Sequence, residues 1–445
     1  MIRIRLNSVL ILGGALALVL MSGVARAQGP SSDDQGGSNS SNTNQYTLDP
    51  GTYRQVQQIQ KLMGASKYDK AIALGKSMQS KVKNESDYAE ALVDELIANS
   101  YLLQKKLDEA EPYLKTIVQL NALQPDSQNS VVQELATVYL SNKNYNGAIR
   151  LYKQVLDQAA KTKTQPGPDL YYRLGLAYSY RGDANKSDSD YKTALEDVKK
   201  AIQMQEDLHQ KDPKKNDAPD KDWYQSWFVV AYKLKDFEQA RSVAKLMVAK
   251  WPNNKDFWNY YVNSALLLHD DMQAAAIYGI MYKRGMLESK DDYLQLASLL
   301  LEQKAPYKAG EVLAEGIDKG IIPKTKDNYD LLSSSWMAAR SWNKALDALG
   351  NEAKLSSTGD VYLQQAQIYL TRRDYANASE AAKNALDKGG MKKTGAAWMT
   401  LGQAEFRLNN YSAAIDAFHK AEQYKDQADN ARSWIKYVAS SRQGG

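Results

Sequence analysis

The residues that most often carry out chemistry are few and scattered in this chain. The three histidines, His209, His269 and His419, lie far apart, and there is no cysteine. Zinc sites bring such ligands together at short, fixed spacings, so no metal site is expected. The Gly-x-Ser-x-Gly segment that presents a serine nucleophile in many hydrolases is also missing from the sequence. We therefore expect a protein that is not an enzyme and that needs no cofactor.

One short segment resembles a phosphate-binding loop. Residues 74–78 read LGKSM, which contains the Gly-Lys-Ser of that motif. The motif needs a second glycine five residues before Gly75, and that position is Lys70. The segment also falls inside a predicted helix, so we expect no nucleotide site.

The first 27 residues have the pattern of a secretory signal peptide. Arg3 and Arg5 precede an apolar run from Val9 to Met21, and Ala25-Arg26-Ala27 is a small-x-small cleavage site. Cleavage is predicted after Ala27. The alternative is a retained membrane anchor, although an apolar run of about 13 residues is short for a membrane span.

Composition points to an exported protein with a protein partner. The predicted signal peptide carries three arginines and no acid, so its removal lowers the net charge from +5 to +2. This balance, without a basic block, argues against a nucleic-acid partner. An exported chain without cysteine is typical of the bacterial periplasm, and it lacks the cysteine that lipoproteins acylate. Residues 28–50 are rich in Gly, Ser and Asn, which predicts a disordered linker.

Beyond residue 50 the sequence repeats. A small residue after a short polar turn recurs at intervals of 33 to 39 residues, with one interval of 53. These residues are Ala71, Ala110, Ala148, Ser187, Ala240, Ala274, Ala309, Ala345, Ala378 and Ala414. In several units another small residue lies twelve positions earlier, with an aromatic residue four positions before it, as in Tyr171 and Gly175 or Trp398 and Gly402.

This spacing resembles the tetratricopeptide repeat (TPR) signature, W-x2-L-G-x2-Y followed by A-x3-F. The resemblance covers residues 51 to about 421 and predicts an all-α TPR superhelical solenoid of about ten helix-turn-helix repeats with a C-terminal capping helix. The residues expected to pack helix against helix are Tyr171, Gly175, Tyr178, Ala148, Ala240, Ala274, Ala345, Ala378, Trp398, Gly402 and Ala414.

The 53-residue interval predicts a boundary. The second helix of the fourth unit continues beyond its neighbours, and a polar segment with two prolines follows it at residues 211–222. We divide the chain into an N-terminal array with an extended last helix, residues 51–212, and a C-terminal array with a capping helix, residues 213–445. Six first helices are expected to carry an N-terminal aspartate as a cap, namely Asp169, Asp222, Asp256, Asp291, Asp327 and Asp360.

The first helices of TPR units line a concave groove, which implies a protein or peptide partner and no small-molecule substrate. The polar and aromatic residues expected there are Tyr172, Tyr180, Gln225, Tyr232, Asn259, Asn263, Gln367, Gln403 and Phe406. Amides and tyrosines suit an extended peptide. The alternative for each residue is an ordinary solvent-facing side chain, and the sequence leaves the oligomeric state open.

Three blocks in the second half resemble the periplasmic TPR proteins associated with TonB–ExbB–ExbD systems. They lie at residues 315–320, 385–390 and 431–438, and the resemblance covers about residues 300–440. It implies an accessory role in TonB-dependent energy transduction and uptake, with an envelope component as partner. A scaffold for envelope assembly or export, in polysaccharide secretion or pilus biogenesis, is the alternative function, and an enzyme of unknown type is the remaining class.

Overall fold

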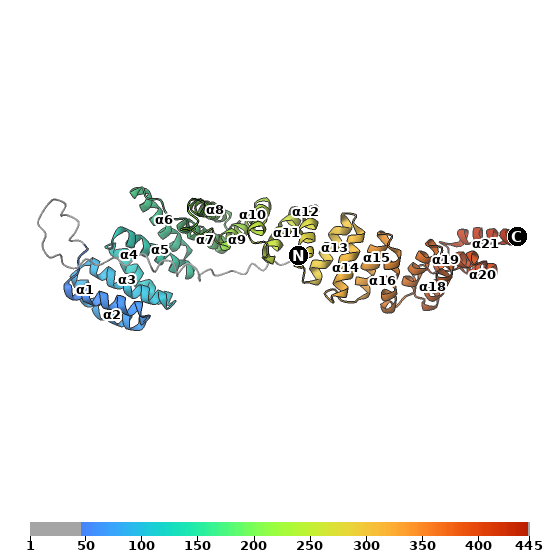
Figure 1. Ribbon diagram of the computed structural model, residues 1–445, viewed down its shortest axis with the longest axis horizontal. Coiled ribbons are helices and arrows are strands. Elements are labelled where there is room, and N and C mark those ends of the chain that lie inside the picture. Colours follow the sequence, from blue (N-terminus) through green and yellow to red (C-terminus); the bar gives the residue numbers. More distant parts are fainter. Residues whose placement is uncertain (1–45, 444–445) are drawn as a thin grey trace. The chain divides into compact units, whose positions relative to one another are not determined.

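All regular secondary structure in the described part of the chain is α-helical. The structure is a computed structural model that describes residues 46–443, and these residues form 21 helices and no strand (Figure 1). The helices follow one another as ten helix-turn-helix pairs and one additional helix. This order confirms the predicted all-α repeat fold. The predicted signal peptide and most of the predicted linker lie outside the described residues.

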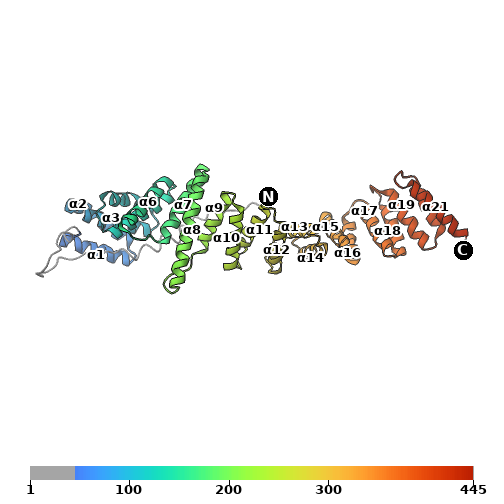
Figure 2. The ribbon, with the colours of Figure 1, turned by 90° about the horizontal axis from the view of Figure 1, so that it is seen from above.

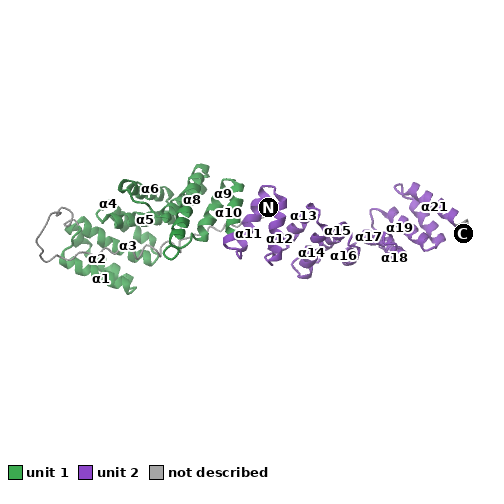
Figure 3. Cartoon of the chain, turned by 45° about the horizontal axis from the view of Figure 1, so that its top comes forward, with its two compact units in different colours: residues 1–247 green, residues 248–445 purple. Residues whose placement is uncertain are grey.

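The chain divides into two compact units, and each is described by itself (Figure 3). Unit 1 ends at Met247, within its last helix. Its helices are α1 (Pro50–Gly64), α2 (Tyr68–Glu85), α3 (Asp87–Leu103), α4 (Leu107–Leu120), α5 (Pro125–Ser141), α6 (Tyr145–Thr162), α7 (Pro168–Asn185), α8 (Asp188–Lys211), α9 (Lys221–Lys233) and α10 (Phe237–Lys250).

Unit 2 begins at Val248 and contains the remaining helices. These are α11 (Lys255–Leu267), α12 (Asp271–Lys283), α13 (Lys290–Glu302), α14 (Pro306–Asp318), α15 (Lys326–Ala338), α16 (Trp342–Leu355), α17 (Asp360–Thr371), α18 (Tyr375–Lys388), α19 (Thr394–Arg407), α20 (Tyr411–Glu422) and α21 (Ala428–Gln443). Each helix of unit 2 after α11 packs against the helix before it in sequence.

The boundary that we expected between residues 212 and 213 falls inside unit 1. α8 is the longest helix of the described chain, with 24 residues (Figure 2), and it packs against both α7 and α9. The hydroxyl of Tyr224 in α9 donates a hydrogen bond to Glu206 near the end of α8. These contacts continue the stack across the polar segment and join α9 to unit 1.

Small residues allow the two helices of a pair to approach closely. The fourth residue of nine second helices is a fully buried alanine, and these alanines are Ala71, Ala110, Ala148, Ala240, Ala274, Ala309, Ala345, Ala378 and Ala414. On the facing helix, a Cβ on Gly402 would lie 2.5 Å from the ring of Phe418, and a Cβ on Gly175 would lie 2.8 Å from Val198. Close packing of this kind leaves no room for a larger side chain.

The fourth pair departs from the expected register. Ser187 does not lie inside α8, because it is the N-cap residue, and its side chain accepts a hydrogen bond from the backbone N–H of Asp190. The fourth residue of α8 is instead Tyr191, a large residue in the place of alanine. Its ring lies 2.9 Å from where a Cβ on Gly182 would stand. A glycine on α7 therefore accommodates the tyrosine on α8.

The six aspartates expected as caps lie in the first turn of their helices, where a carboxylate suits the helix dipole. The capping hydrogen bonds, however, come from the residue before the helix. The side chains of Asp220, Asn254, Ser289 and Thr325 accept them at the starts of α9, α11, α13 and α15. The six aspartates thus lie one or two residues inside the helix; the preceding residue caps four of these helices, and α7 and α17, preceded by Gly167 and Gly359, have no side-chain cap.

The turn inside each pair contains one non-glycine residue with positive φ. The ten residues, with φ from 52° to 63°, are Ser66, Lys105, Lys143, Lys186, Lys235, His269, Lys304, Arg340, Arg373 and Asn409. A left-handed conformation costs a non-glycine L-residue about 1–2 kcal/mol, and glycine adopts it freely. Seven of the ten residues are lysine or arginine, so these turns retain cations at a cost in stability.

Candidate protein-binding surfaces

The residues expected to line a groove lie on first helices, as their spacing requires, but they divide between the two units. Tyr172 and Tyr180 lie on α7, and Gln225 and Tyr232 on α9; Asn259 and Asn263 lie on α11, Gln367 on α17, and Gln403 and Phe406 on α19. Gln367 is exposed, Tyr172 is buried, and the others are half-buried. The described structure therefore does not bring all nine onto one surface.

Tyr172 is a packing residue, which corrects the expectation that it faces a partner. It is 5% exposed, and its ring stacks on Trp223 of α9 at 4.6 Å between centroids. Its hydroxyl lies 3.1 Å from the hydroxyl of Ser226. These contacts join α7 to α9, so a partner cannot reach this side chain without separating the two helices.

Phe406 also belongs to the packing between helices. Its ring lies within 5.4–5.8 Å of the rings of Tyr411, Trp434 and Tyr437, measured between centroids. These rings come from α20 and α21, so Phe406 anchors the last helix. Tyr232 also lies between two rings, those of Phe228 on α9 and Phe237 on α10, whose centroids are 6.2 and 5.8 Å from its own.

Two aromatic residues of the repeat signature lie beneath cations of the following helix. The ammonium of Lys200 lies 3.9 Å from the ring centroid of the half-buried Tyr171, and that of Lys420 lies 4.3 Å from Trp398. Tyr178 is buried. The cation–π contacts keep the aromatic faces shielded from solvent, so the repeat positions themselves offer little surface to a partner.

A buried polar row crosses three first helices of unit 1, and sequence reasoning missed it. Glu95 of α3, Glu134 of α5 and Arg173 of α7 recur at intervals of 39 residues. Arg173 donates hydrogen bonds to Asp169 at 2.5 Å and to the hydroxyl of Thr137 at 3.0 Å. Oε2 of Glu134 is fully buried and has no hydrogen-bond partner. The equal spacing was the available signal for this row.

The buried carboxyl groups of this row hold protons more tightly than exposed ones. Burial raises the pKa of Glu95 to about 7. Burial also raises the pKa of Glu134 to about 8, the charge of Glu95 adds to the effect, and Arg173 opposes it. Desolvation disfavours the charged form of an acid. The row can therefore store protons near neutral pH, but its buried oxygens offer no open position to a ligand.

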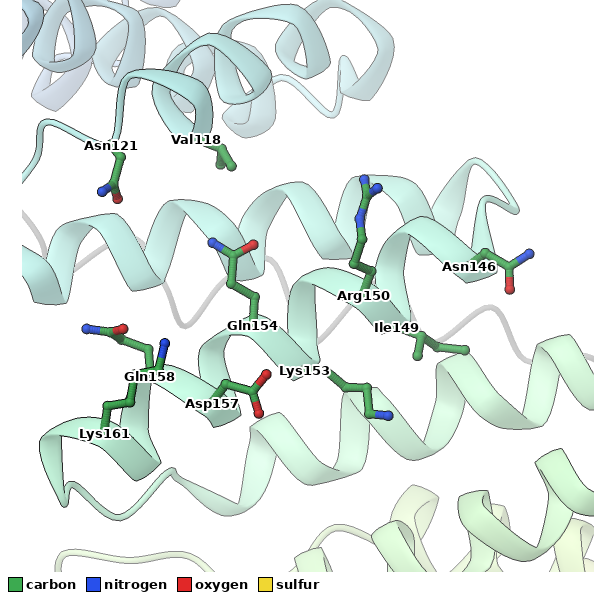
Figure 4. Close-up of a pocket in the computed structure, with 10 residues that line it drawn as sticks. All are labelled: Val118, Asn121, Asn146, Ile149, Arg150, Lys153, Gln154, Asp157, Gln158 and Lys161. Atoms are coloured by element: carbon green, nitrogen blue, oxygen red, sulfur yellow. The ribbon is translucent and has the colours of Figure 1, made fainter.

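A polar groove runs along one face of α6 in unit 1 (Figure 4). It encloses about 700 Å³ and is lined by Val118, Asn121, Asn146, Ile149, Arg150, Lys153, Gln154, Asp157, Gln158 and Lys161. Figure 4 shows Arg150 and Gln154 pointing from α6 toward the side on which Val118 and Asn121 lie. Second helices form this groove, whereas we expected the binding surface on first helices.

The charges of the α6 groove are mostly free. Neither Arg150 nor Lys161 forms an ion pair with any of the described residues, and both are exposed. A helix rises 1.5 Å per residue, so they stand about 16 Å apart along the axis. Amides at Gln154 and Gln158 lie between them. Such a surface can bind carboxylates at two points and hydrogen-bond a peptide backbone between them.

A second hollow, in unit 2, encloses about 1010 Å³ between α12, α14, α15 and α16. Its apolar side is formed by Tyr329, Leu332 and Trp336. On its rim Glu315 accepts hydrogen bonds from Lys319 at 2.5 Å and from the hydroxyl of Tyr282. The seven charged residues of the lining are of mixed sign, with four acids and three lysines. Three of the four charged residues of the α6 groove are cations, so the α6 groove is the stronger candidate for binding an acidic partner.

The described chain has neither a cluster of metal ligands nor a membrane-spanning helix. Among residues 46–443, no three His, Cys, Asp or Glu side chains come together as ligands for a metal ion. In the same part of the chain, no helix combines the length and apolarity that a bilayer span requires.

Two family models of the tetratricopeptide repeat match the sequence, at residues 168–207 and 363–431. The chain contains tetratricopeptide repeats. The first match covers most of α7 and α8, and the second extends from α17 into α21. No curated protein matches the sequence. Tetratricopeptide repeats indicate a protein-interaction scaffold, and the fold is typically non-catalytic.

Solved structures similar to this tetratricopeptide chain are also repeat proteins. One, from Parabacteroides merdae, is 11% identical, with 64% of this chain and 99% of that chain covered and a TM-score of 0.37. The C-terminal part of a repeat protein from Cytophaga hutchinsonii is 15% identical over 68% and 95%, with a TM-score of 0.38. A putative kinesin light chain from Podospora anserina is 16% identical over 46% and 100%, with a TM-score of 0.35.

Proposed function

We propose that this tetratricopeptide protein is a non-enzymatic scaffold of the bacterial periplasm that binds an envelope protein. The observation that carries the binding role is the α6 groove, with its three cations that are unpaired in the described chain, Arg150, Lys153 and Lys161, and the amides among them. An extended segment with acidic side chains fits it, because the cations bind carboxylates and the amides bind backbone groups. Export after cleavage behind Ala27 is supported by the sequence pattern of the first 27 residues.

Within this role, the partner we propose is a component of a TonB–ExbB–ExbD system. The support is the sequence resemblance of residues 315–320, 385–390 and 431–438. Two of these blocks end α14 and α18 at Gly320 and Gly389, whose φ angles are +72° and +69°. Glycine at such a position terminates a helix. The blocks thus serve helix termination, and the partner assignment depends on the resemblance itself.

The experiment is affinity capture from an envelope extract by the mature full-length chain, followed by mass spectrometry. Components of a TonB system are expected in the captured fraction. Arg150→Glu with Lys161→Glu is expected to reduce capture, because it reverses two of the three unpaired cations of the groove. The matched control is Lys70→Glu with Lys192→Glu, which reverses two exposed lysines of the same unit outside the groove.

Other outcomes are equally informative. Capture of polysaccharide-export or pilus-assembly proteins instead would replace the TonB assignment with the assembly role. Equal losses in the groove variant and the control would show that the groove is not the contact surface. The exported protein should have the intact mass of a chain beginning at Gln28, and retention of the first 27 residues would contradict the export proposal.

A further inference from the structure

Exposed cations gather at one edge of the last four repeats in unit 2. This edge consists of the turns between α13 and α14, α15 and α16, α17 and α18, and α19 and α20. The residues within about four positions of each turn include seven cations: Lys304, Lys308, Arg340, Lys344, Arg372, Arg373 and Arg407. They include three acids, Glu302, Asp374 and Glu405, and Glu405 is buried and paired with Lys383. We call this surface the basic edge.

The cations of the basic edge are exposed and unpaired. All seven are exposed, and none of them forms an ion pair with any residue in the described part of the chain. Arg372 donates a hydrogen bond to Asn343, and Lys344 donates one to the hydroxyl of Tyr307. Elsewhere in unit 2, lysines such as Lys255 and Lys383 do pair with carboxylates. The edge therefore keeps an uncompensated positive charge.

The helix dipole does not explain this charge. The first turn of a helix favours acids and disfavours cations. The second helices α2, α4, α8, α10 and α12 each have an acid in the first turn. The four second helices that begin at the basic edge have none, and Lys308 and Lys344 stand there instead. Of these four helices only α18 has an acid at its N-terminus, the N-cap residue Asp374, so α14, α16 and α20 lack a stabilising negative charge on the same side of the stack.

Backbone conformation adds an independent observation. Lys304, Arg340 and Arg373 occupy the strained position of their turns, with φ of 56°, 54° and 62°. Glycine would adopt this conformation without strain. Lysine occupies the same conformation at four turns within pairs of unit 1, so the strained turns support a function for the basic edge only together with its unpaired charge.

We infer that the basic edge binds an extended, acidic protein segment. Neighbouring helices pack about 8–10 Å apart, and one helix lies between successive turns, so these turns stand up to about 20 Å apart. An extended chain advances about 3.3 Å per residue. The fitting segment therefore carries Asp or Glu clusters about every six residues. This inference rests only on the scaffold role and holds whichever envelope system supplies the partner.

An anionic membrane is the less fitting occupant. Peripheral membrane binding combines charge with apolar side chains that insert into the lipid. Tyr307 is the one large aromatic residue that is exposed at this edge, at 46%, and a cation lies over its ring: the ammonium of Lys344 lies 4.6 Å from the ring of Tyr307 and 4.3 Å from that of Trp336. Arg407 likewise lies 5.7 Å from the ring of Phe406. The edge offers charge and hydrogen bonds, which suit carboxylates.

The test uses the mature full-length chain and a fluorescent peptide of glutamates spaced by glycine and serine. The wild type is expected to bind the peptide, and added salt should weaken binding because the contact is electrostatic. The variant Lys304→Gly, Arg340→Gly, Arg373→Gly should bind about tenfold more weakly. It should also melt at a higher temperature, because glycine relieves the strained turns.

The matched control is Lys105→Gly, Lys143→Gly, Lys186→Gly, which relieves the same conformation in three turns of unit 1. It should melt higher as well but keep the affinity of the wild type. A lower melting temperature of the unit 2 variant would show that its cations stabilise the fold, and would overturn the inference. Equal loss of affinity in both variants, or binding to phosphatidylglycerol vesicles without binding to the peptide, would overturn it too. Failure of envelope capture with intact peptide binding would contradict only the proposed function.

Discussion

Replacement of Glu134 by glutamine tests the buried polar row of unit 1. The carboxyl of Glu134 ionises at 4.5 in an unfolded chain, whereas burial raises its pKa to about 8 in the folded protein. Between these two pH values the folded chain holds a proton that the unfolded chain has released. The free energy of unfolding therefore falls as the pH rises from about 4.5 to about 8.

The size of this effect follows from the pKa difference. Each pKa unit corresponds to about 1.4 kcal/mol, so the displacement of Glu134 sets an upper bound of about 5 kcal/mol. Relaxation and water penetration reduce the effect of burial, and we expect a loss of about 2–3 kcal/mol between pH 5 and pH 8. Glutamine has the same shape and no charge. Glu134→Gln should therefore be more stable than the wild type by that amount at pH 8, and about equally stable at pH 5.

The assay is urea denaturation of the full-length mature chain, followed by circular dichroism at both pH values. Glu109→Gln is the control, because Glu109 is exposed on α4 of the same unit. The control should show the same small change at both pH values. The reasoning is refuted if Glu134→Gln changes the free energy of unfolding equally at pH 5 and pH 8, or if the wild type loses no stability over this range.

Two further predictions concern packing. Gly402→Ala should lower the free energy of unfolding by about 1–3 kcal/mol, since its Cβ would overlap the ring of Phe418. The control Gly279→Ala, whose Cβ meets open space on α12, should be neutral or stabilise the fold by about 0.5–1 kcal/mol. Thermal melts of both variants test this prediction. Phe406→Ala should speed amide hydrogen exchange in α21, because the rings of Trp434 and Tyr437 lose their contact with α19. If exchange is unchanged and partner capture is reduced, Phe406 belongs to a binding surface instead.

The helical pairs were predictable because a repeat constrains the same positions many times. A single alanine such as Ala148 or Ala345 does not predict a contact between helices, but nine small residues in one register require closely packed helices. The register failed at Ser187, where sequence similarity favoured a small residue. There the structure places Tyr191 at the contact and compensates with Gly182 on the facing helix. The repeat alignment compares one position at a time, so it cannot predict that a large residue at one position is compensated by a glycine on the facing helix.

The binding surfaces were harder to predict, because exposure depends on contacts between distant residues. Tyr172 has the spacing of a groove residue, and Trp223, 51 residues later, covers it. Eight of the ten residues of the α6 groove follow one face of α6 at three- and four-residue spacing, but that spacing does not show that the end of α4 borders this face and makes it a groove. The basic edge depends on which lysines and arginines have no acidic neighbour, and the sequence does not show which charges are paired.

The cationic turns also determine where trypsin can cleave the folded protein. Trypsin cleaves after lysine and arginine, and exposed turns are the preferred sites of cleavage in folded proteins. Seven of the ten turns within helix pairs present such a residue in the left-handed conformation, from Lys105 in unit 1 to Arg373 in unit 2. Cleavage at these turns separates the two helices of one pair and leaves the packing between neighbouring pairs intact. The fragment pattern under brief digestion would therefore record, pair by pair, the order in which the stack opens.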